Sequence, residues 1–430
     1  MTTKGDIFVP VDALAKIASS NEVHGKLVLR YVASDEIFVV HGVETSRGVR
    51  RQVDIAREYH ALRAGNGSYE GRWIESPNGA LHVVHAELRR RPGAMMTPAD
   101  FKELSGVRLD AGMKTLIVVT HDAGVSADLR AGGVETYAGW HLTREGATPA
   151  SIAIEPATHG LSQLEGRWPL SELSDMNIAV VGCGSIGSVA AEALAGYGVG
   201  SLQLIDPDRL QWHNLVRHSL DRGSVGRSKA IALAESLTQR WQRKSYFAHD
   251  LDVVRDAGVF RALTSDADLV LCTADGIAPR RVVSHVARRA KIPAIVACVL
   301  DGGAIGEVLR LRPTPRFGCL LCVRAHMEEQ GAIDAEADQE LAYGTGTSHL
   351  PMTAVPSDLK FVGVLAAKAA VATLLESRFG DAAQRLPSEH AVIGLRPAGD
   401  LSAPFDVNHA ADVVWRSIPA PRPECVTCNP

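Results

Sequence analysis

The chain of 430 residues has no run of about 18 consecutive apolar residues, the length that a membrane-spanning helix needs. Neither charge is in excess, since 45 Lys and Arg residues face 49 Asp and Glu residues for a net charge of −4. Without a basic excess there is no electrostatic footprint for nucleic acid or for a membrane surface. Residues 1–6 also lack the apolar stretch of an export signal. We therefore expect a cytoplasmic protein that binds neither nucleic acid nor membrane.

Cysteine is scarce, with seven residues in the chain, and four of them form two C-x-x-C pairs. Cys319 with Cys322 and Cys425 with Cys428 can offer four thiolates to one Zn²⁺ in a tetrahedron. The pairs are 103 positions apart (425 minus 322), which exceeds the spacing of a local zinc finger, so the metal would attach the C-terminal arm to the preceding domain. The alternatives are a redox C-x-x-C, which needs a thioredoxin-like context, and disulfides, which need an oxidising compartment. We expect structural zinc, in keeping with a reducing cytoplasm.

The densest signal begins at residues 178–187, where an apolar strand runs into a G-x-G-x-x-G turn and a helix. Such a turn lets the backbone approach a phosphate, and the helix N-terminus offers free N–H groups with a partial positive charge. The candidate nucleotide-binding residues of the turn are Gly182, Gly184, Ser185 and Gly187. Asp206 follows Gly187 by 19 residues (206 minus 187) and forms a D-x-D pair with Asp208. This pattern alone does not identify the nucleotide, because any dinucleotide-binding dehydrogenase has it too.

The residues after Asp206 distinguish a triphosphate-binding site from a dinucleotide-binding site. Asn214, Arg217 and Lys229 add an amide and two cations within 23 residues of Asp206 (229 minus 206), a set suited to a triphosphate. Asp275 follows an apolar strand, and the carboxyl end of such a strand is where open α/β sheets place ligands. An Asp at that position can hold Mg²⁺. His213 and His218, which flank the Asn and Arg, are interpreted as surface or phosphate-proximal rather than catalytic.

From about residue 170 to the C-terminus the chain resembles the ThiF/MoeB/HesA adenylyltransferases, which include the adenylation domains of ubiquitin-activating enzymes. In that family the glycine turn binds ATP, the first acid of the D-x-D pair holds the ribose, and the Asn, Arg and Lys contact the phosphates. The resemblance assigns these roles to Asp206, Asn214, Arg217 and Lys229, with Asp275 as the magnesium ligand. It also implies a structural zinc and a homodimer in which an arginine reaches the partner's ATP. Arg167 is the nearest candidate for that arginine.

The resemblance implies that the substrate is a ubiquitin-like or sulfur-carrier protein with a C-terminal glycine, whose carboxylate becomes an acyl adenylate. A ubiquitin-conjugating-like protein is a further expected partner. The alternatives are adenylation of a peptide carboxylate in peptide modification and a non-catalytic scaffold that keeps the nucleotide site.

The three remaining cysteines bear on the fate of the adenylate. Cys183 lies in the glycine turn, and Cys272 and Cys298 end apolar strands, positions typical of inert buried thiols. Thioester-forming members of the family carry a cysteine after the first C-x-x-C, but residues 326–359 contain none. The run at 344–348 is instead expected to be a mobile crossover loop. We expect the reaction to stop at the acyl adenylate.

Strands and helices alternate from residue 177 onward, which predicts an α/β fold with a Rossmann-like, doubly wound, mainly parallel sheet. The expected helices cover residues 186–197, 229–240, 279–290 and 359–376. Turn-rich segments at 155–160 and 165–169 mark a boundary. Residues 1–160 are expected to form a smaller mixed α/β domain, with strands at 26–31, 37–40 and 116–119. Residues 161–430 are expected to form the ThiF-type, ATP-binding adenylation domain with a C-terminal zinc-binding arm.

Residues 1–160 weakly resemble the JAB/MPN metalloproteases, which use a Glu, then His-x-His-Pro, then Ser-x-x-Asp around zinc. The matching residues are Glu22, His85, Thr97 and Asp100. Glu87 stands where the second His belongs, no Pro follows it, and 15 residues separate His85 from Asp100 (100 minus 85). We therefore expect a JAB-like domain that has lost catalysis, because a missing metal ligand costs more than a shifted one. Alternatively, His82 and His85 are ordinary histidines of a strand.

Overall fold

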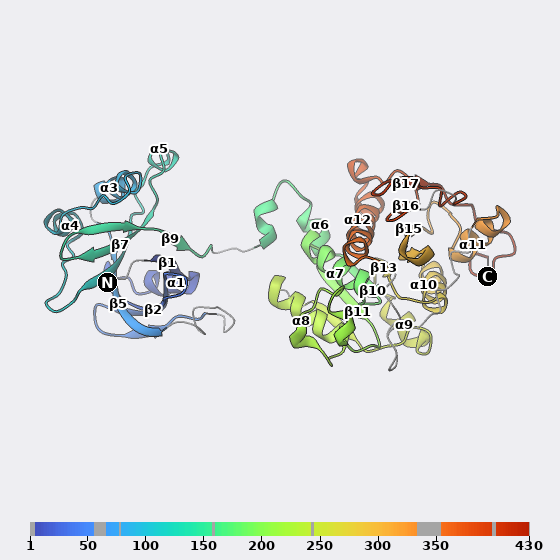
Figure 1. The fold of residues 1–430 in the computed structure, drawn as a ribbon, viewed down its shortest axis with the longest axis horizontal. Helices are drawn as coiled ribbons and strands as arrows, with labels where there is room; N and C mark the ends of the chain where they lie inside the picture. The colour runs from blue at the N-terminus through green and yellow to red at the C-terminus, as the bar shows by residue number, and fades with distance from the viewer. Residues whose placement is uncertain are drawn as a thin grey trace. The chain divides into compact units, whose positions relative to one another are not determined.

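The structure is a computed structural model that describes residues 5–55, 66–76, 79–156, 160–241, 245–332, 354–397 and 401–429. The chain divides into two compact units, Met1–His159 and Gly160–Pro430, called unit 1 and unit 2 below (Figure 1). None of the helices in the described ranges has both the length and the apolar character needed to cross a membrane. The loop expected at 344–348 lies outside the described residues.

Unit 1 is built on a mixed sheet in the order β8-β7-β6-β5-β2-β3-β1-β9, with β4 paired to β3. The strands are β1 (Asp6–Val9), β2 (His24–Val32), β3 (Ile37–Thr45), β4 (Arg50–Gln52), β5 (Asn66–Glu75), β6 (Thr115–His121), β7 (Tyr137–Thr143), β8 (Ala147–Ala150) and β9 (Ile152–Ile154). The helices are α1 (Val11–Ala18), α3 (Ala80–Arg89), α4 (Pro98–Ser105) and α5 (Ala127–Ala131).

Each face of this sheet is covered by different helices. Along β6, Ile117 and Val119 pack in the cluster that contains Ala13 of α1, whereas Leu116 and Val118 pack in the cluster that contains Phe101 of α4. This alternation follows from the two-residue repeat of a strand, which sends successive side chains to opposite faces. Burial on both faces explains why β6 is an uninterrupted apolar run.

Unit 2 is built on a second sheet in the order β12-β11-β10-β13-β14-β15-β16-β17. The strands are β10 (Asn177–Val181), β11 (Ser201–Ile205), β12 (Tyr246–His249), β13 (Leu269–Cys272), β14 (Ala294–Leu300), β15 (Ile305–Leu311), β16 (His390–Gly394) and β17 (Val413–Arg416). The α-helices are α6 (Leu170–Ser174), α7 (Ser185–Tyr197), α8 (Lys229–Trp241), α9 (Ala257–Leu263), α10 (Ile277–Ala290), α11 (Leu320–Glu329) and α12 (Pro356–Phe379). Single 3₁₀ turns are η1 (Gly160–Leu164), η2 (Trp212–Asn214), η3 (Arg222–Ser224), η4 (Asp301–Gly303) and η5 (Ala382–Gln384).

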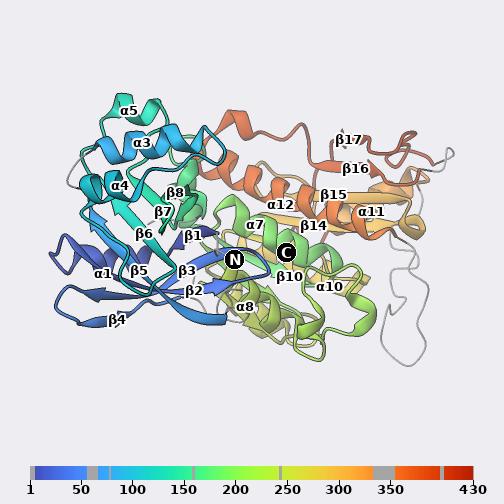
Figure 2. The same cartoon turned by 60° about the vertical axis from the view of Figure 1, so that its left-hand side comes forward.

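Helices cover both faces of this sheet, as expected for a doubly wound fold. Ile178 and Val180 of β10 pack with α7, α8 and α12, whereas Ala179 and Val181 pack with α9, α10 and α11. The long helix α12 lies along α7, and Figure 2 shows both on the same side of the strands. The four helices expected from the sequence are all present, with ends shifted by at most three residues.

The strand order places the candidate site. Strands β12, β11, β10, β13 and β14 are joined by parallel pairs, and the chain winds outward in both directions from β10. The switch point between β10 and β13 is where such sheets bind ligands, outside the carboxyl ends of the strands. The remaining pairs, β14 to β17, are antiparallel, so the sheet is mixed, with four parallel pairs and three antiparallel ones. The hairpin formed by β14 and β15 is joined by a turn too short for a crossover helix.

Candidate active site

The glycine turn lies at the switch point, directly after β10. Gly182 has φ +87°, and a Cβ there would lie 2.6 Å from the Ala274 nitrogen, so only glycine allows this turn to approach the loop after β13. A Cβ at Gly187 would lie 1.8 Å from the Gly182 carbonyl oxygen, which fixes how closely α7 packs on the turn. A Cβ at Gly184 would meet nothing within 4 Å, and no side chain caps the helix that begins at Ser185. The helix N-terminus is therefore open to an anion.

Asp206 lies at the end of β11 and is almost completely buried. Its carboxylate accepts the backbone N–H groups of Cys183 at 2.6 Å and of Asp208 at 2.8 Å. Burial raises the pKa of Asp206, while the nearby Lys229 ammonium opposes that rise. The carboxylate thus joins the glycine turn to the D-x-D loop, and each oxygen keeps a second lone pair for a hydroxyl donor.

Lys229 begins α8, and its Nζ donates to Asp208 Oδ2 at 2.8 Å. Burial alone would lower the pKa of this ammonium, but the Asp206 and Asp208 carboxylates outweigh burial and raise it. Asp275, which follows β13, acts in the same direction on Lys229. The structure therefore brings residues from three separate loops within electrostatic reach of one another.

The loop of Asn214 and Arg217 completes the group. Asn214 Oδ1 accepts the Gln211 N–H at 2.9 Å, so its NH₂ group is the half of the amide that can donate to a phosphate oxygen. Arg217 Nε is buried and, among the described residues, has no hydrogen-bond partner. A buried guanidinium N–H without a partner is costly, and a phosphate oxygen would satisfy it. Asp275 is exposed at the start of α10, free to hold Mg²⁺ beside such phosphates.

The site residues thus fit ATP and Mg²⁺ by their chemistry: open helix N–H groups, an arginine N–H without a partner, a charged lysine and an exposed carboxylate. The profile of the ThiF family matches residues 160–387, more than half of the chain. The chain belongs to the ThiF family.

Two Escherichia coli relatives are similar to parts of unit 2. The tRNA threonylcarbamoyladenosine dehydratase is 35% identical over 151 residues, covering 35% of this chain and 54% of that protein. The molybdopterin-synthase adenylyltransferase is 31% identical over 150 residues, covering 34% of this chain and 59% of that protein. The chain thus spans little more than half the length of these relatives. A crystal structure of E. coli MccB with AMPCPP and MccA superposes with a TM-score of 0.45 at 18% identity, covering 60% of this chain and 68% of MccB.

The four cysteines of this ThiF-family chain that were expected to bind zinc come together. The Sγ atoms of Cys319, Cys322, Cys425 and Cys428 all lie within 4.8 Å of one another. Three of the separations are 3.5, 3.9 and 4.0 Å. Zn–S bonds of about 2.3 Å in a tetrahedron place the sulfurs about 3.8 Å apart, whereas a disulfide needs about 2.05 Å. The geometry fits zinc and not disulfides.

The other three cysteines are fully buried, as expected from the sequence. Burial raises the pKa of Cys272 to about 11 and that of Cys298 to about 12, and raises the pKa of Cys183 well above its ordinary value. The Cys298 thiol also donates to Glu307. A thiol is nucleophilic only as an exposed thiolate, so these three side chains do not fit that role.

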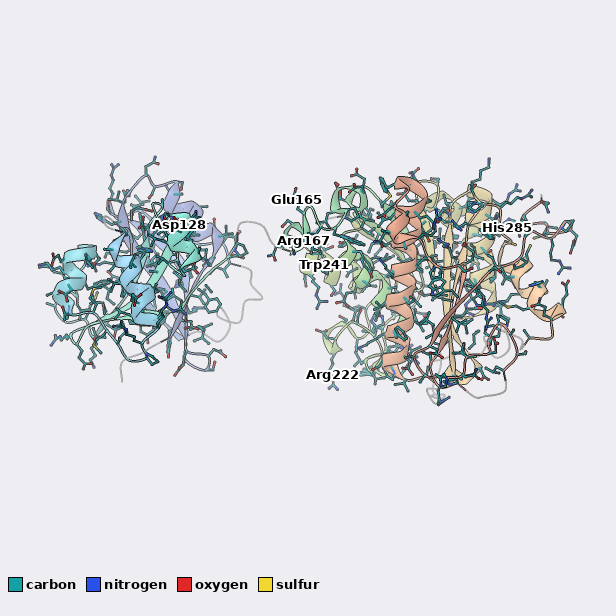
Figure 3. All side chains as sticks on the ribbon, turned by 90° about the horizontal axis from the view of Figure 1, so that it is seen from above. Asp128, Glu165, Arg167, Arg222, Trp241 and His285 are labelled. Atoms are coloured by element: carbon teal, nitrogen blue, oxygen red, sulfur yellow. The ribbon has the colours of Figure 1, made fainter. Side chains whose placement is uncertain are left out.

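Arg167 lies far from the glycine turn of its own subunit. Its neighbour Trp168 donates from Nε1 to the carbonyl of Tyr197, the last residue of α7. The helix has 13 residues, so about 20 Å of helix separate Trp168 from the turn. Figure 3 shows Arg167 and His285, which binds Thr427 of the zinc-binding arm, at opposite ends of unit 2. Arg167 is therefore no ligand of ATP in its own chain.

In unit 1, Glu22, His85 and Asp100, the residues expected from the sequence to bind a metal, do not lie close together. Within the described ranges, the set of cysteines in unit 2 is the one group of metal-binding side chains that are close enough together. Glu22 instead accepts the Ser46 N–H, and Asp100 accepts the Thr97 hydroxyl at 2.7 Å at the start of α4. This pairing is a helix cap, which is why a hydroxyl and an acid recur at that spacing.

His82 and His85 are not strand residues, because they lie on the buried face of α3. His85 Nε2 donates to the Gly139 carbonyl at 3.0 Å, and burial lowers the pKa of His85 to about 4. His82 bonds to the Glu135 carbonyl and to Thr120. Both rings are thus structural histidines of a helix. Glu87, two positions after His85, lies on the exposed side of α3 and pairs with Arg90.

Two residues near the nucleotide site were not identified as functional from the sequence. His218, expected at the surface or near the phosphates, is buried beside the glycine turn, and burial lowers its pKa to about 4. Thr273 directly follows β13, two positions before Asp275. Both side chains bond to carbonyls of the glycine turn. The signal that could have identified them is position alone, since each is adjacent or nearly adjacent to a predicted site residue.

Proposed function

We propose that this chain is an ATP- and Mg²⁺-dependent adenylyltransferase that activates the C-terminal carboxylate of a ubiquitin-like or sulfur-carrier protein. The observation that carries the proposal is the convergence of loops after β10, β11 and β13 on one edge of the sheet. There the open N-terminus of α7 is bonded to the loop that carries Arg217, whose buried Nε–H lacks a partner in the described part of the chain. A dinucleotide-binding domain has no need for this second set of cations.

The proposed reaction is an in-line displacement at the α-phosphate. The substrate carboxylate forms a bond to the α-phosphorus, the bond from that phosphorus to the bridging oxygen breaks, and pyrophosphate leaves with the electron pair. A carboxylate is already ionised at neutral pH, so the step needs no general base. Arg217 and Lys229 would neutralise the charge that builds on the phosphate oxygens.

Asp275 is the residue proposed to hold Mg²⁺, which would supply charge neutralisation on the phosphates. Asp206 would receive a ribose hydroxyl on the lone pairs that its two backbone bonds leave over. Asn214 would donate its NH₂ group to a phosphate oxygen. Catalysis would thus consist of positioning and electrostatic stabilisation.

The substrate class is supported by family membership and by the molybdopterin-synthase adenylyltransferase, whose name describes transfer to a protein. The absence of cysteine from residues 326–359, and the burial of Cys183, Cys272 and Cys298, support a reaction that ends at the acyl adenylate. A homodimer in which Arg167 reaches the partner's ATP is part of the proposal; it rests on the family resemblance, and the distance of Arg167 from the glycine turn of its own chain is compatible with it.

ATP–pyrophosphate exchange tests the function directly. Purified chain is incubated with ATP, Mg²⁺, labelled pyrophosphate and candidate small proteins ending in glycine, with a variant lacking the terminal glycine as the matched control. We expect label to enter ATP only with the intact protein. Exchange with short peptides and not with small proteins would replace this substrate class by a peptide. No exchange with either, although ATP binds, would make the chain a nucleotide-binding scaffold.

A further inference from the structure

The backbone carbonyls of the glycine turn are occupied by side chains from the two charged loops. Thr273 Oγ1 donates to the Gly182 carbonyl at 2.7 Å, and His218 Nε2 lies 2.7 Å from the Cys183 carbonyl oxygen. A carbonyl can only accept, so Nε2 carries the proton. The Leu220 N–H donates to Nδ1 at 3.1 Å, so the ring is the neutral tautomer with both nitrogens used.

These two bonds affect how the turn can face a phosphate. A carbonyl oxygen directed at a polyphosphate would repel it, whereas an N–H group attracts it. The carbonyls of Gly182 and Cys183 are held by donors from the protein, and Gly184, the next residue, has open space where a Cβ would lie. The N–H groups of Gly182 and Cys183 donate to Ile205 and Asp206, so with these two carbonyls satisfied the part of the turn that can face a phosphate is the uncapped start of α7, from Gly184 onward.

The donors also join the turn to the loops that carry charge. His218 directly follows Arg217, and Thr273 lies two residues before Asp275. A third bond, from the Ser219 N–H to Ser188 Oγ at 3.3 Å, links the same loop to α7. The segments that carry Arg217 and Asp275 are therefore held relative to the turn by hydrogen bonds of buried side chains.

We propose that His218 and Thr273 are positioning residues. They hold the loop of Arg217 and the loop of Asp275 against the glycine turn, and this pair of hydrogen bonds is called the latch below. This latch rests on the proposed function, because its purpose is to set the distances between ATP, Arg217 and Asp275. His218 does not transfer protons, since both ring nitrogens are engaged and the ring is buried. A displacement of about 1 Å at such a site lowers turnover on the order of a hundredfold.

The test for His218 compares two substitutions in the full chain. His218→Gln keeps a donor for Cys183 and an acceptor for Leu220, whereas His218→Ala keeps neither. We expect His218→Ala to raise the dissociation constant of Mg-ATP by roughly tenfold and to lower kcat further, with KM for the carboxylate substrate unchanged. His218→Gln should stay within about threefold of the wild type. His285→Ala is the control, because that ring lies within α10 and bonds Thr427 of the C-terminal arm.

The outcomes separate the latch from the proposed function. Mg-ATP binding is measured by calorimetry without any substrate, so it does not depend on exchange. Wild-type binding by His218→Ala, or equal weakening in His218→Gln, would overturn the latch while the adenylyltransferase function stands. A wild-type chain that binds ATP without exchanging pyrophosphate would overturn the function and not the latch.

Thr273 provides a second measurement in case His218→Ala does not fold. Thr273→Val has nearly the same volume and loses only the donor to Gly182, whereas Thr273→Ser keeps it. We expect Thr273→Val to weaken Mg-ATP binding by roughly tenfold and Thr273→Ser to bind as the wild type does. Equal binding by both variants would contradict the latch on this side of the turn.

Discussion

Units 1 and 2 are both α/β domains with a large mixed sheet, yet the residues expected to act together meet in only one of them. In unit 2, Asp206, Lys229 and Asp275 come from three loops and lie within electrostatic reach of one another. In unit 1, His85 lies on α3 and bonds the Gly139 carbonyl, whereas Asp100 lies on α4 and bonds Thr97. Parallel strands deliver the residues after their carboxyl ends to one edge whatever the loop length, whereas residues on helices are placed by the face of each helix.

The largest expected effect therefore falls on a residue at that edge. We expect Asp275→Ala to lower substrate-dependent pyrophosphate exchange by roughly a thousandfold or more, because a single carboxylate is proposed to hold the metal. The circular dichroism spectrum and the unfolding midpoint should not change, since Asp275 is exposed. Asp122→Ala, which alters an acid after strand β6 of unit 1, is the matched control and should keep full exchange. Full exchange by Asp275→Ala would remove Asp275 from the site.

The contrast also shows what the sequence could and could not predict. Helices α7, α8, α10 and α12 were predictable from apolar periodicity, and the placement of Lys229 and Asp275 from the order of strands. The partners of His218 and Thr273 were not, because a hydrogen bond across 35 or 91 residues depends on how the loops fold back. The antiparallel strands β15 to β17 were missed because their lengths and apolar character resemble those of parallel strands. His85 was misplaced because a short apolar stretch with histidines fits a strand and a helix equally well.

Loss of zinc from unit 2 is expected to have the second largest effect. It tests the other group of side chains that meets in unit 2 and has no counterpart among the described residues of unit 1. We expect elemental analysis to find one zinc per chain, bound by Cys319, Cys322, Cys425 and Cys428. Replacing Cys425 and Cys428 by Ser should remove the metal and lower the free energy of unfolding by several kcal/mol, because a zinc at these four cysteines would join the C-terminal arm to α11. Cys298→Ser is the control, since it changes a buried thiol that lies in β14, outside the set of four. Zinc retained by the double variant would contradict the site.

Acid should destabilise each unit through one buried histidine. The pKa values of His85 and His218 are lowered from 6.5 to about 4, so the unfolded chain binds more protons between those pH values. The stability present above about pH 6.5 is therefore lost as pH falls towards about 4, by on the order of 3 kcal/mol for each ring. Hydrogen exchange followed by mass spectrometry can measure this loss separately in each unit.

Replacing each histidine by glutamine, whose side chain does not titrate, supplies the control for the acid effect. His85→Gln should flatten the pH dependence of exchange protection between about pH 7 and pH 5 in unit 1 and leave unit 2 unchanged. His218→Gln should do the reverse. An unchanged pH dependence in both variants would mean that other groups govern acid unfolding.

The smallest expected effect tests whether Glu22, His85 and Asp100 are apart in solution, as they are in the described residues of unit 1. Glu22→Gln and Asp100→Asn each remove a carboxylate from the weak JAB-like pattern, and we expect zinc content to stay at one per chain and pyrophosphate exchange to stay at the wild-type rate. Stability should fall by no more than about 1 kcal/mol, because Glu22 accepts one exposed backbone N–H and Asp100 belongs to a helix cap. A wild-type content of two zinc ions that falls to one in either variant would show that unit 1 does gather these side chains. The two units would then differ in how a site is built, and no longer in whether one exists.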